Sequence, residues 1–394
     1  MINNIIDRSD GLFSTDLTNF QDELTDLVKS SKVLIIGAAG TIGAATTKQI
    51  FNRNPSVLHA VDISENNLVE LVRDIRSSVG YLNVDFRTFA VDCGSVEFEA
   101  FVQFHGPYDY VFNLSALKHV RSESDPYTLM RLVQVNIFNT INTLRLTSSK
   151  SLKKYFCVST DKAANPVNMM GASKKIMELF LHRESLSQSV SMARFANVAF
   201  SDGSLLHGFN QRFLSKQPIA APNDILRYFL TPDESGELCV LSGLLGRNRE
   251  IFFPKLTNDF KLINFSDIAK RYIEEKGFKV YECESEDDAR INAVKLIDKG
   301  YWPCYFFASD TTGEKGAEEF FTHDESLDLD RFESLGVIKN DYKVDFDDLD
   351  KFWNSIILLK EGRSWDKKHI LELFNLLLPT FNHFEKGKYL DNKM

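Results

Sequence analysis

The chain is poor in cysteine and has no excess of basic residues. Only 5 of its 394 residues are cysteines, and no two of them form a Cys-x-x-Cys pair. This argues against a disulfide framework and against a zinc site. With 46 Lys and Arg against 55 Asp and Glu, the formal net charge of -9 has the wrong sign for a protein that binds nucleic acid or an anionic membrane.

The sequence also shows neither a signal peptide nor a membrane span. Its first residues, MINNIIDRSDGLF, are polar, with no cationic start before an apolar run. No stretch approaches the roughly 18 apolar residues that a membrane span needs. The acidic runs that begin at residues 284 and 345 have no His or Cys partners, so we expect solvated helix starts there and no metal site. We therefore expect a cytoplasmic protein that neither inserts into a membrane nor binds nucleic acid.

Six continuous apolar runs alternate with helical patterns in the first half of the chain. The runs are VLIIG from residue 33, SVLHAVD from 56, VDFRTFAVD from 84, YDYVFNLSA from 108, KKYFCVST from 153 and SVSMARFAN from 189. A buried parallel strand has this composition, and a crossover helix separates it from the next strand. The pattern predicts an α/β protein with a Rossmann-type doubly wound parallel sheet.

A glycine-rich loop follows the first of these runs. Gly37, Gly40 and Gly43 stand in VLIIGAAGTIGAATTKQIF, after the predicted strand and at the start of a predicted helix. Such a loop lets the backbone approach a pyrophosphate, and the helix N-terminus supplies oriented N–H groups. We expect Thr41 and Ile42 to bind the same dinucleotide. Tight packing of helix on strand is the structural alternative for the glycines.

Two acidic residues close the next two strands. Asp62 stands roughly 20 residues after Gly43, the offset expected of an acid that binds the adenosine ribose. Its carboxylate would repel a 2′-phosphate, which favours NAD over NADP. Asp92 is a candidate for contact with the adenine. A turn at the end of a strand is the alternative for either residue.

The segment YFCVSTDKAANPVNMMGASKK (155–175) lies at the carboxyl end of the fifth strand, where open α/β sheets place their ligands. With LSALKHV (114–120), RFANV (194–198) and RYFLT (227–231), it resembles the nucleotide-sugar 4,6-dehydratases of the extended short-chain dehydrogenase/reductase superfamily. The G-x-x-G-x-x-G spacing is typical of that superfamily. The resemblance covers about residues 30–285.

The resemblance implies dehydration of UDP-N-acetylglucosamine for a bacterial surface glycan, with a bound NAD that is regenerated each turnover. The reaction oxidises C4, removes the C5 proton, expels the C6 hydroxyl and returns hydride to C6, so it needs a base near C5 and an acid near the C6 oxygen. SDTTGEKGAEEF, from residue 309, resembles longer relatives that open the legionaminic acid and bacillosamine pathways. GDP-N-acetylglucosamine remains an alternative donor.

Three adjacent residues leave the fifth strand with an alcohol, a carboxyl and an amine. They are Thr160, Asp161 and Lys162. By resemblance, Asp161 is the acid that protonates the leaving C6 hydroxyl and Lys162 is the base at C5. A lysine acts as a base only if its pKa falls, and we expect the nicotinamide cation and Lys174 to lower it.

Lys174 lies one helical turn after Met170 and is also expected to bind the cofactor. In most of the superfamily this pair is Tyr and Lys, and the phenolate takes the C4 hydroxyl proton. A thioether cannot take it usefully. Resemblance to the dehydratases with Met at this position implies retention of configuration at C5. The C4 proton would then leave through Thr160, Asp161 or a water near Lys174.

Four further residues are expected at the substrate by resemblance. Lys118 and His119 would line the sugar and nicotinamide pocket, while Asn197 and Arg227 would hold the nucleotide diphosphate, which suits the donor fork of an arginine. The alternatives are a structural histidine and an ordinary surface arginine. Ala196 stands where the family usually has Gly.

These assignments divide the chain into four parts. Residues 1–30 are an N-terminal helical leader, and 31–197 are the NAD-binding Rossmann domain that carries the catalytic segment. Residues 198–300, broken by Gly and Pro, are a smaller substrate-binding lobe. Residues 301–394 are a C-terminal helical extension, whose amphipathic HILELFNLLLP needs a partner surface in this chain or in a second subunit.

Two other functions remain open. A nucleotide-sugar 4-epimerase needs only the C4 base, so the Asp161–Lys162 pair counts against it. A catalytically silent dinucleotide-binding protein would explain the loss of the tyrosine, but it would not need Asp161, Lys162 and Lys174. Relatives commonly pair through two helices of the dinucleotide-binding domain, so we expect a homodimer or a higher homo-oligomer.

Overall fold

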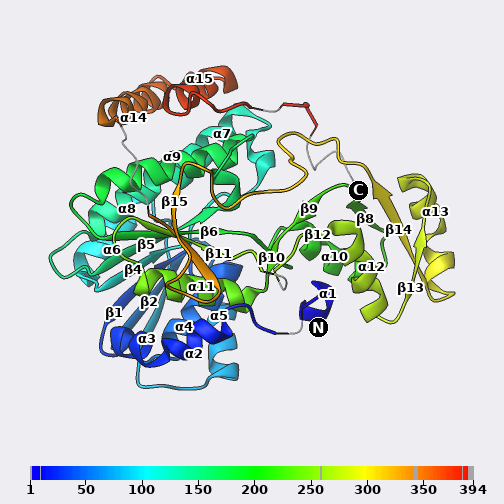
Figure 1. Cartoon of the computed structure of the whole chain (residues 1–394), viewed down its shortest axis with the longest axis horizontal. Coiled ribbons are helices and arrows are strands. Elements are labelled where there is room, and N and C mark those ends of the chain that lie inside the picture. Colours follow the sequence, from blue (N-terminus) through cyan, green and yellow to red (C-terminus); the bar gives the residue numbers. More distant parts are fainter. Residues whose placement is uncertain (1, 9, 258–259, 340–344, 384, 389–394) are drawn as a thin grey trace.

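The structure, a computed structural model, describes residues 2–8, 10–257, 260–339, 345–383 and 385–388. A nine-stranded sheet crosses the larger of two lobes (Figure 1) in the order β15-β16-β11-β6-β5-β4-β1-β2-β3. Its strands are β1 (Lys32–Ile36), β2 (Val57–Asp62), β3 (Asp85–Ala90), β4 (Tyr110–Asn113), β5 (Lys154–Thr160), β6 (Val190–Phe195), β11 (Glu250–Pro254), β15 (Ser326–Asp328) and β16 (Leu335–Lys339).

The six predicted strands are confirmed as β1 to β6. They pair in parallel, in the order 3-2-1-4-5-6, and β11 continues the parallel sheet beside β6. The strand order reverses between β1 and β4, so the carboxyl ends of these two strands flank the crevice where a doubly wound sheet binds its ligand. The Rossmann-like fold is therefore as expected.

Helices cover both faces of the large sheet. One face carries α3 (Gln21–Val28), α4 (Thr41–Phe51), α5 (Glu65–Ser78) and α11 (Pro232–Leu245). The other carries α6 (Val96–His105), α7 (Pro126–Val133), η2 (Gln134–Asn139), α8 (Thr140–Thr147) and α9 (Met169–Glu184). Because both faces are covered, β1, β4, β5 and β6 are almost entirely buried.

The smaller lobe has its own sheet and its own core. A three-stranded sheet in the order β13-β14-β8 packs with helices around Phe209, Tyr272 and Trp302, all fully buried. Its elements are α1 (Ile2–Ile5), α10 (Leu205–Leu214), β8 (Ile219–Pro222), α12 (Phe265–Glu275), β13 (Lys279–Glu282), α13 (Glu286–Ile297) and β14 (Tyr301–Phe307). Two short strand pairs lie between the sheets: β7 (Asn197–Val198) with β10 (Phe229–Leu230), and β9 (Leu226–Arg227) with β12 (Ile263–Asn264).

The chain crosses between the two lobes more often than the expected division into four consecutive parts allows. Within 198–300, α11 packs on α4 and β11 joins the large sheet. The expectation of a purely helical extension over 301–394 is wrong, because β14 belongs to the small sheet and β15 and β16 to the large one. The leader is not one helix but α1, α2 (Ser14–Asn19) and α3. A short apolar run does not indicate which distant strand it will pair with, so the sequence did not predict that these later strands join the two sheets.

The two C-terminal helices find their partner surface in this chain. α14 (Phe346–Glu361) and α15 (Lys367–Leu377) pack on each other, and α15 lies against α7 and α9 (Figure 1). Trp353 stacks on Phe138 with ring centroids 3.9 Å apart. The amphipathic helix of the C-terminal segment is therefore covered by the large lobe itself.

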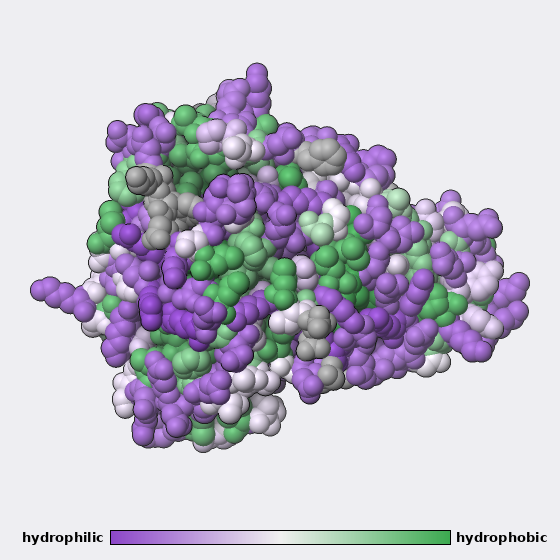
Figure 2. All heavy atoms as spheres, viewed as in Figure 1, coloured by the Kyte–Doolittle hydropathy of each residue, from purple (hydrophilic) through white to green (hydrophobic). Residues whose placement is uncertain are grey.

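The surface carries no broad apolar belt on the face shown in Figure 2. There, hydrophobic residues form separate patches among hydrophilic ones. Of the helices in the described part of the chain, none combines the length and the apolar composition needed to cross a membrane.

A fully buried arginine ties three segments of the large lobe together. Arg194, on β6, donates to both carboxylate oxygens of Glu178 on α9, at 3.0 and 2.8 Å. It also donates to both oxygens of Glu325, each at 2.8 Å, and to the carbonyl oxygen of Phe320 at 2.8 Å. The segment that precedes β15 is thus held against β6 and α9 by charge-assisted hydrogen bonds.

We expect Arg194→Met to lower the free energy of unfolding by about 3–5 kcal/mol, because it removes the cation that donates hydrogen bonds to both buried carboxylates and leaves them with the longer ion pairs of Lys175, at 3.7 and 3.5 Å. Denaturant unfolding followed by fluorescence measures this. As a control, Arg87→Met breaks an exposed pair with Asp85 and should cost less than about 1 kcal/mol. Equal stability of the Arg194 and Arg87 variants would contradict the importance of the buried network.

Candidate functional site

The predicted site residues gather at the carboxyl edge of the large sheet. The glycine loop follows β1, Ser115 follows β4, and Thr160 ends β5. The loop after β7 approaches from the other side, where the Asp202 N–H donates to Thr41 Oγ1 at 3.1 Å. The structure therefore brings the two expected halves of the site, the glycine loop and the segment after β5, to one edge.

The three glycines of the loop differ in whether a side chain would fit at their positions. Gly37 has a φ of +76°, and a Cβ there would lie 2.7 Å from the backbone nitrogen of Ser115. A Cβ on Gly43 would lie 2.0 Å from the carbonyl oxygen of Gly37. Gly40 differs, because the nearest atom to its added Cβ would be 3.8 Å away. Packing thus explains two glycines, whereas a Cβ on Gly40 would make only an ordinary van der Waals contact.

Gly40 stands at the start of a helix. Gly40 is the N-cap of α4, and no side chain of the described residues caps the helix. The N–H groups of the first turn, including those of Thr41 and Ile42, therefore have no side-chain acceptor there. A helix N-terminus whose first N–H groups have no side-chain acceptor suits a pyrophosphate, so the loop fits a dinucleotide.

The two acids after the neighbouring strands both hold turns. Asp62 Oδ2 accepts the N–H of Ala39 in the glycine loop, and its Oδ1 accepts the N–H of Ser64, both at 2.9 Å. Asp92 Oδ1 accepts the N–H of Gly94 at 2.9 Å. Each carboxylate oxygen can accept more than one hydrogen bond, so the turn geometry leaves Asp62 able to accept a ribose hydroxyl as well.

Thr160, Asp161 and Lys162, which leave β5, form a compact cluster. Asp161 Oδ1 accepts hydrogen bonds from Thr160 Oγ1 and from the Lys162 backbone N–H, both at 2.8 Å, and from Lys162 Nζ at 3.0 Å. Asp161 Oδ2 is buried and has no hydrogen-bond partner among the described residues. One oxygen of Asp161 is thus held by the protein, and the other could accept or donate a further hydrogen bond.

Lys162 does not have the lowered pKa that we expected. Burial lowers its pKa, but the carboxylates of Asp161 and Glu318 outweigh burial and hold it above the ordinary value. Its ammonium also lies 3.5 Å from Asn197 Oδ1, which brings Asn197 into the same cluster. The lowering of the Lys162 pKa that we expected from Lys174 is smaller than the raising by the two acids.

Met170 and Lys174 lie on the first turns of α9. Gly171 lets this helix approach Lys162 closely, since a Cβ there would lie 2.5 Å from the Lys162 carbonyl oxygen. Met170 is buried, and Lys174 donates to the carbonyl oxygen of Val158 at 2.9 Å. Burial lowers the pKa of Lys174.

Lys118 and His119 face the loop that follows β7. Lys118 Nζ donates to Ser201 Oγ at 3.3 Å, and burial lowers the pKa of this lysine. A Cβ on Gly203 would lie 2.9 Å from His119 Nε2. Burial, and then the charges of Lys118 and Arg121, lower the pKa of His119, so its ring is neutral at neutral pH.

Arg227 is not an ordinary surface arginine, because it is only 3% exposed. Its Nη1 donates to the carbonyl oxygens of Leu226 and Lys315, at 2.8 and 2.9 Å, and its Nη2 pairs with Glu314 at 3.0 Å. The guanidinium therefore holds the segment that begins at residue 314. A contact with a diphosphate would have to replace some of these bonds.

The same segment supplies a residue that sequence reasoning missed. Glu318 is buried, and both of its carboxylate oxygens lack a hydrogen-bond partner in the described part of the chain. The Asn168 side chain, at the start of α9, donates to the Gly313 carbonyl oxygen at 3.0 Å. This bond holds the segment around residue 313 beside α9. The only available signal was the acidic pair that ends TTGEKGAEE, in a motif that resembled longer relatives.

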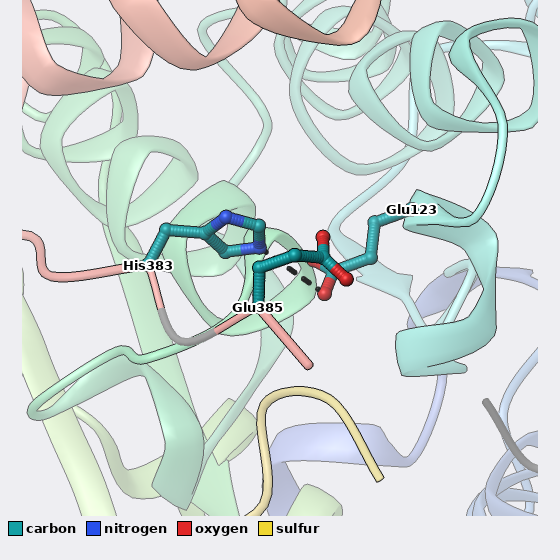
Figure 3. Close-up of side chains that lie close together, drawn as sticks. All are labelled: Glu123, His383 and Glu385. Carbon is teal, nitrogen blue, oxygen red and sulfur yellow. Dashed lines mark hydrogen bonds and ion pairs between the residues drawn. The ribbon is translucent and has the colours of Figure 1, made fainter. Parts of the chain in front are cut away.

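Figure 3 shows a second cluster, formed by Glu123, His383 and Glu385, whose possible ligand atoms lie within 4.8 Å of one another. Glu123 Oε2 accepts the N–H of Met169 at 2.6 Å, and His383 Nε2 lies 3.3 Å from Glu123 Oε1. Glu385 Oε1 accepts the Thr312 hydroxyl at 3.0 Å. Through Glu123, these contacts tie the C-terminal segment to the start of α9.

Comparison with known proteins places the chain in a family. The model of the polysaccharide biosynthesis protein family matches residues 33–339, so the chain belongs to this family. An uncharacterized membrane protein of Methanocaldococcus jannaschii is 28% identical over 81% of this chain and 88% of its own length. The capsular polysaccharide biosynthesis protein CapD of Staphylococcus aureus is 28% identical over 67% of this chain but only 43% of its own length.

A third relative is named as an enzyme. The UDP-N-acetylglucosamine 4,6-dehydratase (inverting) of Campylobacter jejuni is 24% identical over 74% of this chain and 90% of its own length. Among solved structures, Pen from Bacillus thuringiensis matches with a TM-score of 0.66 and 24% identity, over 90% of this chain and 98% of that one. A UDP-glucuronic acid 4-epimerase from Bacillus cereus, in complex with UDP-glucuronic acid and NAD, matches with a TM-score of 0.53 and 17% identity, over 73% and 89%. These structural matches establish the shared fold.

We expect Gly43→Ala to lower the free energy of unfolding by more than about 2 kcal/mol, because its Cβ would overlap the Gly37 carbonyl oxygen. Gly40→Ala is the matched control, since its Cβ would lie 3.8 Å from the Gly37 carbonyl oxygen, an ordinary van der Waals distance, and it should cost less than about 1 kcal/mol. Denaturant unfolding measures both. If Gly40→Ala were the more destabilising variant, the division of roles among the glycines would be wrong.

Proposed function

We propose that this chain is an NAD-dependent UDP-N-acetylglucosamine 4,6-dehydratase that retains the configuration at C5 and serves the synthesis of a bacterial surface glycan. One observation carries the proposal: Asp161 and Lys162 form a 3.0 Å pair at the end of β5, with Asp161 Oδ2 unpartnered among the described residues. Dehydration needs such an acid and base, whereas epimerisation at C4 does not. The family and the name of the Campylobacter jejuni relative support the same class.

The cofactor assignment rests on the glycine loop. The first turn of α4, with Gly40, Thr41 and Ile42, would hold the pyrophosphate, and Asp62 would accept the ribose hydroxyls. Asp92 would lie toward the adenine. When bound, NAD accepts hydride from C4 of the sugar and returns it to C6. The Bacillus cereus neighbour, solved with NAD, supports this choice.

The protein's own groups move the protons. Lys162 takes the C5 proton and later returns it, and Asp161 protonates the C6 oxygen as water leaves. Because the neighbouring acids raise the pKa of Lys162, this lysine must lose its proton before it can act as the base. Lys118, His119 and Asn197 would bind the sugar nucleotide from the opposite loops.

Retention at C5 is proposed from Met170, which replaces the usual tyrosine. The Campylobacter jejuni relative is named as inverting, so the two indications oppose each other and the product must decide. GDP-N-acetylglucosamine is the alternative donor. The silent dinucleotide-binding protein remains the alternative from another class, supported only by the missing phenol.

We also propose that the chain forms at least a homodimer in the cytoplasm. The C-terminal helix α15 already covers part of α7 and α9. A dimer formed through helices of the dinucleotide-binding domain would therefore have to use the surfaces that α15 leaves uncovered.

Incubation of the purified protein with UDP-N-acetylglucosamine in heavy water should yield a product that has lost one water and carries deuterium at C5. Coupling constants in the NMR spectrum should be those of a gluco-configured C5. The GDP sugar, run in parallel, identifies the donor by its relative rate. An inverted C5 would contradict retention, and no turnover of either sugar with NAD bound would favour the silent protein.

Lys162→Met should abolish dehydration, with a loss of at least about 10²-fold in kcat, because it removes the C5 base. Bound NAD, measured by its absorbance after denaturation of the protein, should remain. Lys153→Met is the matched control, since Lys153 is more than half exposed and precedes β5, whereas Lys162 follows it; its ammonium lies 3.3 Å from Asp109 and 5.6 Å from the Tyr110 ring centroid. Loss of NAD from the Lys162 variant would show that this lysine belongs to the cofactor site instead.

A further inference from the structure

Three side chains that the proposed function does not use converge from two distant parts of the chain. They belong to Glu123, which ends the 3₁₀ turn Val120–Glu123, and to His383 and Glu385, which follow α15. Figure 3 shows the three side chains pointing toward one another, although Glu123 stands 260 residues before His383. One ligand atom of each residue, a ring nitrogen or a carboxylate oxygen, lies within 4.8 Å of those of the other two.

Glu123 is a buried acid without a permanently charged partner. Its side chain is 0% exposed, and no lysine or arginine in the described part of the chain forms an ion pair with it. Its Oε2 accepts the Met169 N–H at 2.6 Å, and its Oε1 lies 3.3 Å from His383 Nε2. Buried carboxylates are paired with a cation or coordinate a metal. His383 balances this charge only as an imidazolium, whereas a metal ion would balance it with the ring neutral.

Glu385 differs from Glu123 because it already has a cation beside it. Its Oε2 pairs with Lys367, and its Oε1 accepts the Thr312 hydroxyl at 3.0 Å and the Gly387 N–H at 2.9 Å. Burial raises the pKa of Glu385, but these hydrogen bonds outweigh burial and lower it to about 2. Glu385 is therefore ionised at neutral pH. A carboxylate oxygen can accept more than one bond, so these contacts orient Glu385 and still leave it able to bind a metal.

The three groups together form a donor set that suits a transition metal. Imidazole nitrogen and carboxylate oxygen are both common ligands of Zn²⁺, and three protein ligands leave one position for water. Mg²⁺ and Ca²⁺ prefer oxygen ligands alone. Two ionised carboxylates and a neutral imidazole carry two negative charges, which balance a divalent cation. The scarcity of cysteine in this chain argues only against a zinc site built from cysteines, and this cluster contains none.

We propose that Glu123, His383 and Glu385 bind one first-row divalent transition-metal ion, of which Zn²⁺ fits best because it stands near the top of the affinity order for such ligands. His383 Nε2 and one oxygen of each carboxylate are the protein ligands. Because Glu123 accepts the N–H of the first residue of α9, the ion ties the C-terminal segment to the helix that carries Met170 and Lys174. It takes no part in the proposed dehydration.

Calorimetric titration with Zn²⁺ alone tests the site. After treatment with a chelator and its removal, the full chain should bind one ion, whereas Mg²⁺ at the same concentration should not bind. His383→Ala should lower the Zn²⁺ affinity at least about 10-fold, and Glu123→Gln should do the same. His369→Ala is the matched control, because this exposed histidine of α15 lies 3.2 Å from Asp366 and outside the cluster.

Zn²⁺ binding of equal strength in His383→Ala and in the unchanged protein would overturn the proposal, and so would the lack of a site that takes one ion per chain. In the second case, His383 is the imidazolium partner of Glu123 and the cluster is an ion pair. None of these measurements uses UDP-N-acetylglucosamine or NAD, so failure of the metal site and failure of the dehydratase assignment are told apart.

A spectroscopic measurement on the unchanged protein decides the ligands even if a variant does not fold. One equivalent of Co²⁺ in place of Zn²⁺ should give the weak visible bands of an ion bound by nitrogen and oxygen. The intense near-ultraviolet band of a Co²⁺–thiolate bond should be missing. If that band appears, the metal is bound by one of the five cysteines and the proposal is wrong.

Discussion

The buried guanidinium of Arg194 fixes the positions on which the rest of the candidate site depends. It joins β6, α9 through Glu178, and the segment before β15 through Glu325. α9 carries Met170 and Lys174, and the third segment is continuous with the turn that carries Glu318. Planar, bidentate ion pairs fix both distance and orientation. The network therefore holds α9 and the segment before β15 in fixed positions relative to β6.

The charges of the site come from parts of the chain that lie far apart in sequence. Asp161 and Lys162 leave β5, Arg227 ends β9, and Glu318 arrives only after the chain has built the smaller lobe. Each of these groups alone would be costly to bury, and their mutual attraction lowers that cost. Arg227 is accordingly held by the Glu314 carboxylate and by the carbonyl oxygens of Lys315 and Gly316.

The sequence predicted those features of the structure that depend on residues close together along the chain. The apolar runs predicted β1 to β6, and the strand, loop and helix context predicted the glycine loop, because each depends on residues close in sequence. The pairing of β16 with β11 could not be predicted, since buried antiparallel and parallel strands are equally apolar at this length. The pKa of Lys162 was expected to fall through Lys174 and the nicotinamide cation, but the charge of the adjacent Asp161 raises it. Glu318 raises it further, and no periodicity predicts this second effect because Glu318 comes from a distant segment.

The replacement of tyrosine by Met170 changes what the neighbouring lysine can do. In a Tyr–Lys pair, the ammonium stabilises a phenolate, which is a base with an intrinsically high pKa. Here Lys174 donates to the Val158 carbonyl oxygen, and its neighbour one turn earlier has no proton to lose. Asp161 and Glu318 are carboxyl groups, whose ordinary pKa is far lower than that of a phenol. Burial raises the pKa of Glu318, and Arg227 and Lys315, each 3.8 Å from one of its oxygens, offset part of the cost of burying it.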